Sequence, residues 1–95
     1  MTNTEYKELI ERWTKLVNDS NITLSDHKPV PTLFWKTFLG ITRSVHVEIM
    51  NGTYRRKEFS PGLLRTIHFV NLLEQRIFID EVKLAIPLFE ANKRK

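Results

Sequence analysis

Apolar side chains recur at helical spacing along most of the chain, and two stretches show this pattern most clearly. In residues 4–18 the apolar positions follow i, i+3, i+4, i+7, i+10 and i+11, which places one helix face at Tyr6, Leu9, Ile10, Trp13, Leu16 and Val17. In residues 60–75 a similar face is formed by Leu63, Leu64, Ile67, Val70 and Leu73. We therefore predict two amphipathic helices, the first capped by Thr4 and the second by Ser60, with Pro61 in its first position.

Two further helices are predicted around a glycine and a proline. Residues 32–39 are mostly apolar and precede Gly40, which can end a helix in the left-handed conformation, so we expect a largely buried helix. In residues 79–92 one face carries Ile79, Val82, Ile86 and Phe89. Pro87 lacks the N–H needed for the helical hydrogen bond, so this helix should kink or split there. The polar residues 18–31, which contain two prolines, are typical of a connector.

Residues 40–59 support two different predictions, of which the first is a β-hairpin. Apolar and polar side chains alternate along this segment, with the apolar positions at Val45, Val47 and Ile49. Asn51-Gly52 follows at once, and this dipeptide after an alternating run is a strong signal for a hairpin turn. The β-branched valines also lower the helix propensity.

The second prediction for the same segment is a helix that follows a short turn. Residues 32–39 would be the supporting helix, and Gly40 and Ile41 would form the turn, with Ile41 packed between the two helices. Thr42 would cap the second helix, which would run to about Met50. We favour this prediction, because the flanking elements are helical and an isolated hairpin needs something to pack on. The expected fold is a mostly α single domain over residues 1–95: a compact bundle of about five helices with a helix-turn-helix and a frayed end at 93–95. The alternative is an α+β fold with the hairpin at 43–59.

The turn and the helix after it carry a short motif. The turn is formed by Leu39-Gly40-Ile41-Thr42-Arg43-Ser44, and Ile49 and Asn51-Gly52 lie near the end of the second helix. Over about residues 32–75 this pattern resembles the Cro/lambda-repressor-like family of bacterial and phage DNA-binding proteins. Lys36 and His46 depart from it, because the family has a small residue and a buried aliphatic residue there. The resemblance implies a second helix in the major groove of double-stranded DNA, with base contacts from Thr42, Arg43, Ser44, Val47 and Glu48.

Positive charge is concentrated in the middle of the chain. Residues 28–66 carry seven basic and two acidic side chains, whereas residues 1–27 carry three basic and five acidic ones. A local positive field attracts polyanions, of which nucleic acid is the commonest in a cytoplasm. Whether the segment is a helix or a hairpin, we expect phosphate contacts from Tyr54, Arg55, Arg56 and Lys57.

Composition and motifs disfavour several classes of protein. The absence of cysteine excludes a disulfide-stapled scaffold and a cysteine-based zinc site. The three histidines have no acidic partner at metal-ligand spacing, and we find no glycine-rich phosphate loop, so we expect no enzyme, metal or cofactor. His68 is expected to be a hydrogen-bonded core or interface residue. A charged N-terminus and the lack of a long apolar run lead us to expect a cytoplasmic protein without a membrane partner.

Three functional hypotheses follow from these features. The leading one is a sequence-specific DNA-binding protein, a small transcriptional regulator of the phage or plasmid type, acting as a homodimer joined through the apolar face of the last helix. The alternative is a protein-binding module, such as a small inhibitor or an antitoxin, with an exposed patch formed by Phe34, Trp35 and Phe38 together with the apolar last helix. A third is RNA binding, in which Tyr54 would stack on a base.

Overall fold

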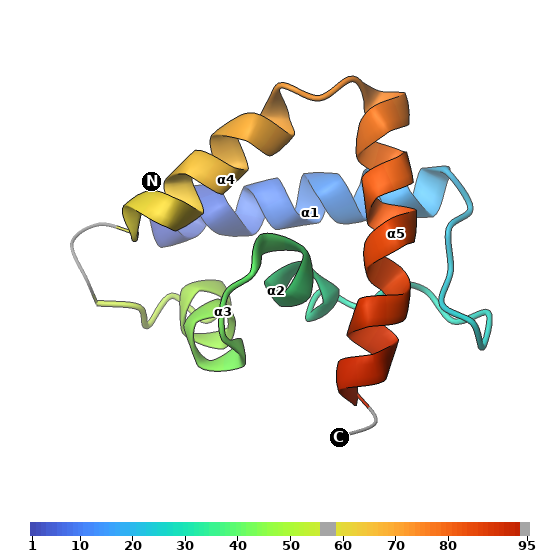
Figure 1. Ribbon diagram of the computed structural model, residues 1–95. Coiled ribbons are helices and arrows are strands. Elements are labelled where there is room, and N and C mark those ends of the chain that lie inside the picture. The colour runs from blue at the N-terminus through green and yellow to red at the C-terminus, as the bar shows by residue number, and fades with distance from the viewer. Residues whose placement is uncertain (56–58, 94–95) are drawn as a thin grey trace.

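The course of the chain is seen in a computed structural model that describes residues 1–55 and 59–93. The described residues form five helices and no strand: α1 (Asn3–Asp19), α2 (Phe34–Leu39), α3 (Arg43–Met50), α4 (Pro61–Asn71) and α5 (Gln75–Lys93) (Figure 1). The expectation of a mostly α fold of about five helices is confirmed. The hairpin alternative is wrong, because residues 43–50 are helical and residues 53–55 form no strand.

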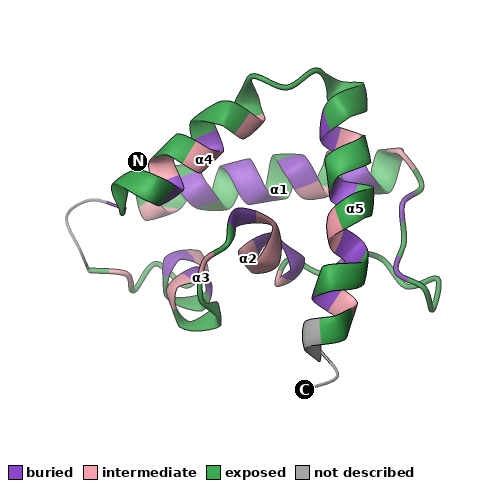
Figure 2. Ribbon diagram, in the orientation of Figure 1, coloured by how far each residue is buried: buried purple, intermediate pink, exposed green. Residues whose placement is uncertain are grey.

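The helices pack around one shared core. α1 lies across the middle of the view in Figure 1, and α5 crosses in front of it at a steep angle. α3 packs against α1, whereas α2 packs against α5 and α4. The buried faces of all five helices meet in a single apolar cluster (Figure 2). The two long helices α1 and α5 therefore hold the two short helices in place.

The first helix begins earlier than the expected cap at Thr4. The hydroxyl of Thr2 accepts a hydrogen bond from the backbone N–H of Glu5 at 3.1 Å, and the Glu5 carboxylate accepts one from the backbone N–H of Thr2 at 3.0 Å. This reciprocal capping box pairs two N–H groups at once, which favours the earlier start. The predicted apolar face is otherwise confirmed: it buries Tyr6, Leu9, Ile10, Trp13 and Val17.

The break between the last two helices also lies earlier than expected. Ser60 caps α4 as predicted, since its hydroxyl accepts a hydrogen bond from the backbone N–H of Leu63 at 3.2 Å. The chain then turns at residues 72–74, so α4 is shorter and α5 longer than the pattern indicated. Leu73, predicted to face the core, lies in this turn and is exposed.

The last helix is continuous through Pro87, so the expected split there is wrong. Ile86 and Phe89, on either side of the proline, are buried in the same core, which keeps the two halves of the helix together. Lys83, whose carbonyl loses its N–H partner, is exposed, so water can bind in its place. The helix includes Lys93, and the rest of the predicted frayed end lies outside the described residues.

An aromatic junction joins α1, α2 and α5. Neighbouring rings in it have centroids 5.0 to 6.2 Å apart, and its members are Trp13, Phe34, Trp35, Phe38, Phe78 and Phe89. Trp35 is fully buried and stacks on Phe78 at 6.0 Å, while its Nε1–H donates to Thr14 Oγ1 at 2.9 Å. Phe34 is also fully buried, so Phe34 and Trp35 do not belong to an exposed patch as the protein-binding hypothesis expected, whereas Phe38 is half-buried. The expectation that this helix is largely buried is confirmed.

The junction also covers the apolar face of α5 that was expected to join two copies. On that face Val82, Ile86 and Phe89 are buried, and Ile79 is half-buried. The prediction that this face forms a dimer interface is therefore wrong, because the chain's own core already contacts it.

The connector between α1 and α2 is fastened to the body of the protein. Its apolar residues Ile22, Leu24 and Val30 are buried. Thr23 and Pro29 form an antiparallel bridge, and both the backbone N–H and the hydroxyl of Ser25 donate to the carboxylate of Glu90 on α5. These contacts place the start of α2 against α5.

Candidate nucleic-acid interface

A tight turn leads from α2 into α3. Gly40 has a φ of +71°, a left-handed conformation that glycine adopts without strain, and the N–H of Ile41 bonds back to the carbonyl of Lys36 at 2.9 Å. The hydroxyl of Thr42 then accepts a hydrogen bond from the backbone N–H of Val45 at 3.2 Å. The predicted turn, cap and second helix are therefore confirmed.

A buried polar contact holds the inner face of α3. The hydroxyl of Tyr6 and Nδ1 of His46 lie 2.9 Å apart, and both residues are buried. Burial raises the pKa of the Tyr6 phenol, so it stays protonated and can donate. Burial, with a smaller effect from the charge of Lys36, lowers the pKa of His46, so its ring stays neutral and can accept. We call this the Tyr6–His46 contact.

The helix that supports α3 is therefore α1. A helix-turn-helix interpretation of the sequence expected α2 to have this role, with Ile41 packed between α2 and α3. In the structure α3 packs against α1, His46 contacts Tyr6 of α1, and Ile41 is half-buried against the core. His46, at a position where the resemblance implied an aliphatic residue, is buried but uses its ring nitrogen to bond across to α1.

The outer face of α3 carries the five residues that were predicted to contact bases. Each of them is exposed: Thr42, Arg43, Ser44, Val47 and Glu48. Positions 43, 44, 47 and 48 lie on one side of a helix because successive side chains are about 100° apart. The structure therefore brings these residues together, opposite the buried His46 and Ile49.

The chain folds back against the end of α3 after Gly52. The backbone N–H groups of Thr53 and Tyr54 both donate to the carbonyl of Glu48, at 2.9 and 3.2 Å. The side-chain amide of Asn3 donates to the carbonyl of Tyr54 at 3.1 Å, which ties this segment to the start of α1. These bonds place residues 53–55 beside the outer face of α3.

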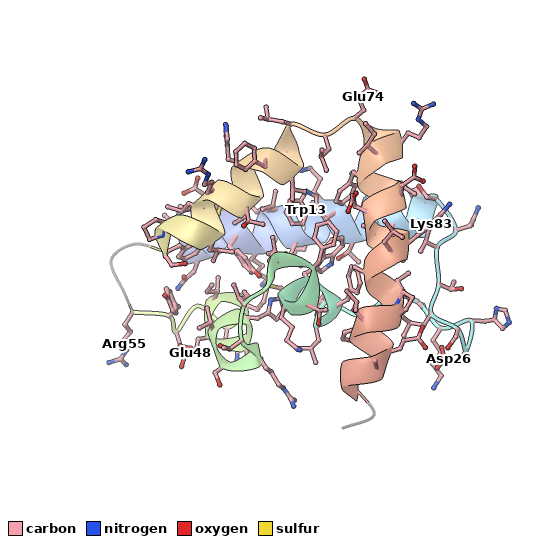
Figure 3. The ribbon with its side chains drawn as sticks, viewed as in Figure 1. Trp13, Asp26, Glu48, Arg55, Glu74 and Lys83 are labelled. Atoms are coloured by element: carbon pink, nitrogen blue, oxygen red, sulfur yellow. The ribbon has the colours of Figure 1, made fainter. Side chains whose placement is uncertain are left out.

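The predicted phosphate contacts differ in their surroundings. Tyr54 is half-buried and packs edge-on against Phe59, with ring centroids 5.6 Å apart. Part of its ring therefore packs against the core. Arg55 is exposed and lines a shallow hollow together with Glu48. Figure 3 shows Glu48 and Arg55 on the opposite side of the view from Lys83. The other two predicted contacts, Arg56 and Lys57, lie outside the described residues.

Three other features were searched for in the described part of the chain: a metal site, a membrane-spanning helix and a buried histidine on α4. Within residues 1–55 and 59–93, no group of three or more His, Asp or Glu side chains could hold a metal ion. None of the described helices is both long and apolar enough to cross a membrane. His68 is exposed on α4, so its predicted place in the core is wrong.

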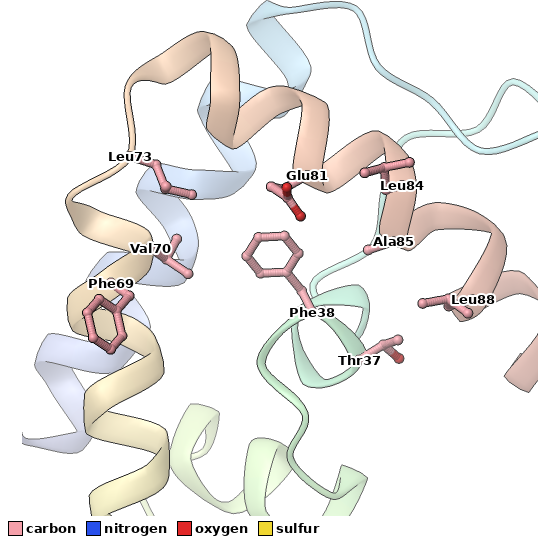
Figure 4. Close-up of a pocket in the computed structure, with 9 residues that line it drawn as sticks. All are labelled: Thr37, Phe38, Phe69, Val70, Leu73, Glu81, Leu84, Ala85 and Leu88. Carbon is pink, nitrogen blue, oxygen red and sulfur yellow. The ribbon is translucent and has the colours of Figure 1, made fainter.

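One surface feature overlaps in part with the patch that the protein-binding hypothesis expected, although the part contributed by α4 was not predicted. An open groove lies between α4 and α5, and we call it the α4–α5 groove (Figure 4). Its apolar lining includes Phe38, Phe69, Val70, Leu73, Leu84 and Leu88. A signal for it was present, since Leu84 and Leu88 recur at helical spacing outside the apolar face of α5 that was predicted to join two copies.

No protein-family model matches the chain, and no curated protein or solved structure is significantly similar to it.

Proposed function

We propose that the protein binds double-stranded DNA by placing α3 in the major groove, and that it is a small cytoplasmic transcriptional regulator and not an enzyme. The division of α3 into two faces carries this proposal. The inner face is held in the core, and the outer face is exposed and mostly polar over residues 42–48. A helix held by one side and free on the other has the shape that the major groove admits.

The side chains on the outer face suit the edges of base pairs. Arg43 can donate two hydrogen bonds to a guanine, and Glu48 can accept one from the amino group of a cytosine. Thr42 and Ser44 offer hydroxyl groups at the start of the helix, and Val47 offers a methyl surface for thymine. This mixture of donors, acceptors and one apolar side chain favours sequence-specific reading.

Arg55 supports the same proposal from beside the helix. It is exposed on the segment that the Glu48 carbonyl holds next to α3. Contacts with phosphates fix the register of a protein on the duplex without reading its sequence. Arg56 and Lys57 follow Arg55 in the sequence and extend this positive segment.

DNA is favoured over double-stranded RNA by the shape of the groove. The major groove of A-form RNA is deep and narrow, so a helix such as α3 cannot reach the bases there. An RNA duplex of matching sequence should therefore compete poorly for the protein.

The test is fluorescence anisotropy with a random-sequence DNA duplex over a series of salt concentrations. In the variant Arg55→Ala, the slope of log affinity against log salt should become shallower by about 0.9, the change expected for one lost phosphate contact. Sequence selection followed by Arg43→Ala should show weaker discrimination at one base pair, by about 1–3 kcal/mol.

A charge-matched control separates a local site from general attraction. Arg43→Ala/Arg55→Ala removes two positive charges beside α3, and Arg76→Ala/Lys83→Ala removes two exposed ones from α5. The first variant should bind much more weakly and the second nearly as well as the wild type. Equal losses in both variants, or no binding of the wild type at low salt, would contradict the proposal.

A further inference from the structure

The α4–α5 groove is an apolar surface that the chain leaves open. It has a volume of about 380 Å³, with Phe38 of α2 between its two walls (Figure 4). Its rims project into solvent: Phe69, Leu84 and Leu88 are 52, 69 and 63% exposed. Large contiguous apolar patches are uncommon on monomeric proteins and mark sites of interaction. The groove therefore has the composition of a protein interface.

Besides its buried core face, α5 carries a second, mostly apolar stripe that runs along this groove. Its core face is formed by Phe78, Val82, Ile86 and Phe89. A separate stripe, at i, i+4, i+7 and i+11, consists of Ile77, Glu81, Leu84 and Leu88, all exposed. This spacing is the heptad pattern by which helices pair, and a single polar residue within such a seam sets the register of the pair.

Opposite charges lie on the two sides of the groove, the positive one on Arg65, which is next to the lining residue Phe69 and does not itself line the groove. On the α4 side, the guanidinium of Arg65 lies 5.4 Å from the ring centre of Phe69. On the α5 side, Glu81 lines the groove. A two-fold rotation that sets α4 of one copy against α5 of another brings each positive side to a negative one. The same patch also contains both a hollow and projecting leucines, so the surface is complementary to itself.

We propose that a second copy of this chain occupies the α4–α5 groove. Leu84 and Leu88 of each copy enter the groove of the other, and Glu81 of each copy approaches Arg65 of the other. The apolar contacts supply most of the driving force, and the charge pairs fix the register.

This dimer leaves the outer face of α3 free. The lining of the groove comes from α2, α4 and α5, and none of the described residues that line it belongs to α3. The inference does not rest on DNA binding, because association is measured without DNA. If both proposals hold, the dimer presents two copies of α3 to two half-sites.

The first test is sedimentation velocity of the full chain without DNA over a wide range of protein concentration. The wild type should change from monomer to dimer as concentration rises, and Leu84→Glu/Leu88→Glu should remain monomeric. Both leucines are exposed, so the variant should keep its helix content, which circular dichroism checks. Val47→Glu, a change at an exposed apolar residue outside the groove, should dimerise as the wild type does.

Two results of this experiment would overturn the proposal. One is a wild type that stays monomeric at every concentration, which would point to a different partner. The other is a leucine variant that keeps its fold and dimerises as strongly as the wild type.

A charge exchange tests the two-fold arrangement directly. Arg65→Glu alone and Glu81→Arg alone place like charges opposite each other, so each should raise the dissociation constant roughly tenfold or more. An equimolar mixture of these two variants restores an opposite-charge pair at both contacts and should associate as the wild type does. A mixture that associates no better than either variant alone would rule out this arrangement.

Discussion

The two halves of α1 are attached to the rest of the molecule in different ways. The half that carries Trp13 enters the aromatic junction, where rings from α2 and α5 surround it. The half that carries Tyr6 packs against α3 and adds a buried hydrogen bond to His46. The first attachment is made mainly by aromatic rings, and the second combines packing with one directional polar contact.

This difference has a consequence for the candidate site. Apolar packing stabilises in proportion to the surface it buries and tolerates small rotations, whereas a hydrogen bond requires a particular orientation of its two partners. Because Tyr6 bonds to the inner face of α3, it sets the rotation of that helix about its axis. We therefore expect the aromatic junction to contribute mainly through apolar burial, and the Tyr6–His46 contact to favour the rotation of α3 that is seen.

The largest expected effect is the loss of a ring from the aromatic junction. Trp35→Ala should lower the free energy of unfolding by about 3–5 kcal/mol, because it leaves a cavity among packed rings. Urea unfolding followed by circular dichroism measures this. Leu84→Ala, at an exposed apolar residue, should change stability by no more than about 0.5 kcal/mol under conditions where the protein is monomeric. Similar losses in the two variants would contradict the assignment of stability to the junction.

A smaller loss of stability is expected when the Tyr6–His46 contact is removed. Tyr6→Phe keeps the buried ring but leaves Nδ1 of His46 without its hydrogen-bond partner, which should lower the free energy of unfolding by about 1–3 kcal/mol. Tyr54→Phe removes the same hydroxyl from a half-buried ring and should cost less than about 0.5 kcal/mol. The comparison uses the same urea titration. If Tyr6→Phe were neutral, the hydrogen bond would not be what orients α3.

The turn before α3 should also contribute to the free energy of unfolding, through its backbone conformation and not through side-chain packing. Gly40→Ala forces an alanine into a positive φ and should cost about 1 kcal/mol or more, although an added Cβ meets nothing within 4 Å. Gly62→Ala adds the same methyl group in open space within α4, where it should be neutral or stabilise by up to about 1 kcal/mol. Equal effects of the two substitutions on thermal unfolding would show that the left-handed turn is not needed.

The smallest expected effect is a dependence of stability on pH, which should come from the Tyr6–His46 contact and not from the aromatic junction. The pKa of folded His46 lies below its ordinary value of 6.5, so the folded state favours the neutral ring. The stability that this contributes is present above about pH 6.5 and is lost as pH falls through the folded pKa. Urea unfolding at several pH values should show this loss, and His46→Gln should reduce it.

Local patterns were sufficient for much of the fold and for part of the candidate site. Periodicity located the buried face of α1, and the glycine and hydroxyl residues at Gly40, Thr42 and Ser60 marked the ends of helices correctly. Once residues 43–50 are helical, the grouping of Arg43, Ser44, Val47 and Glu48 on one side follows from helix geometry. These features depend on residues within a few positions of one another, which is why a sequence pattern can predict them.

Other features depended on contacts between distant parts of the chain. Residues 43–50 suited a hairpin nearly as well as a helix, and packing against α1 favours the helix. Tyr6 and His46 are 40 positions apart, so no local pattern indicated that α1 and not α2 supports α3. Of the two apolar stripes on α5, the sequence cannot say which one α2 covers, and in the structure that choice leaves Leu84 and Leu88 exposed. Periodicity reports that a face is apolar, but only the packed helices decide what lies against it.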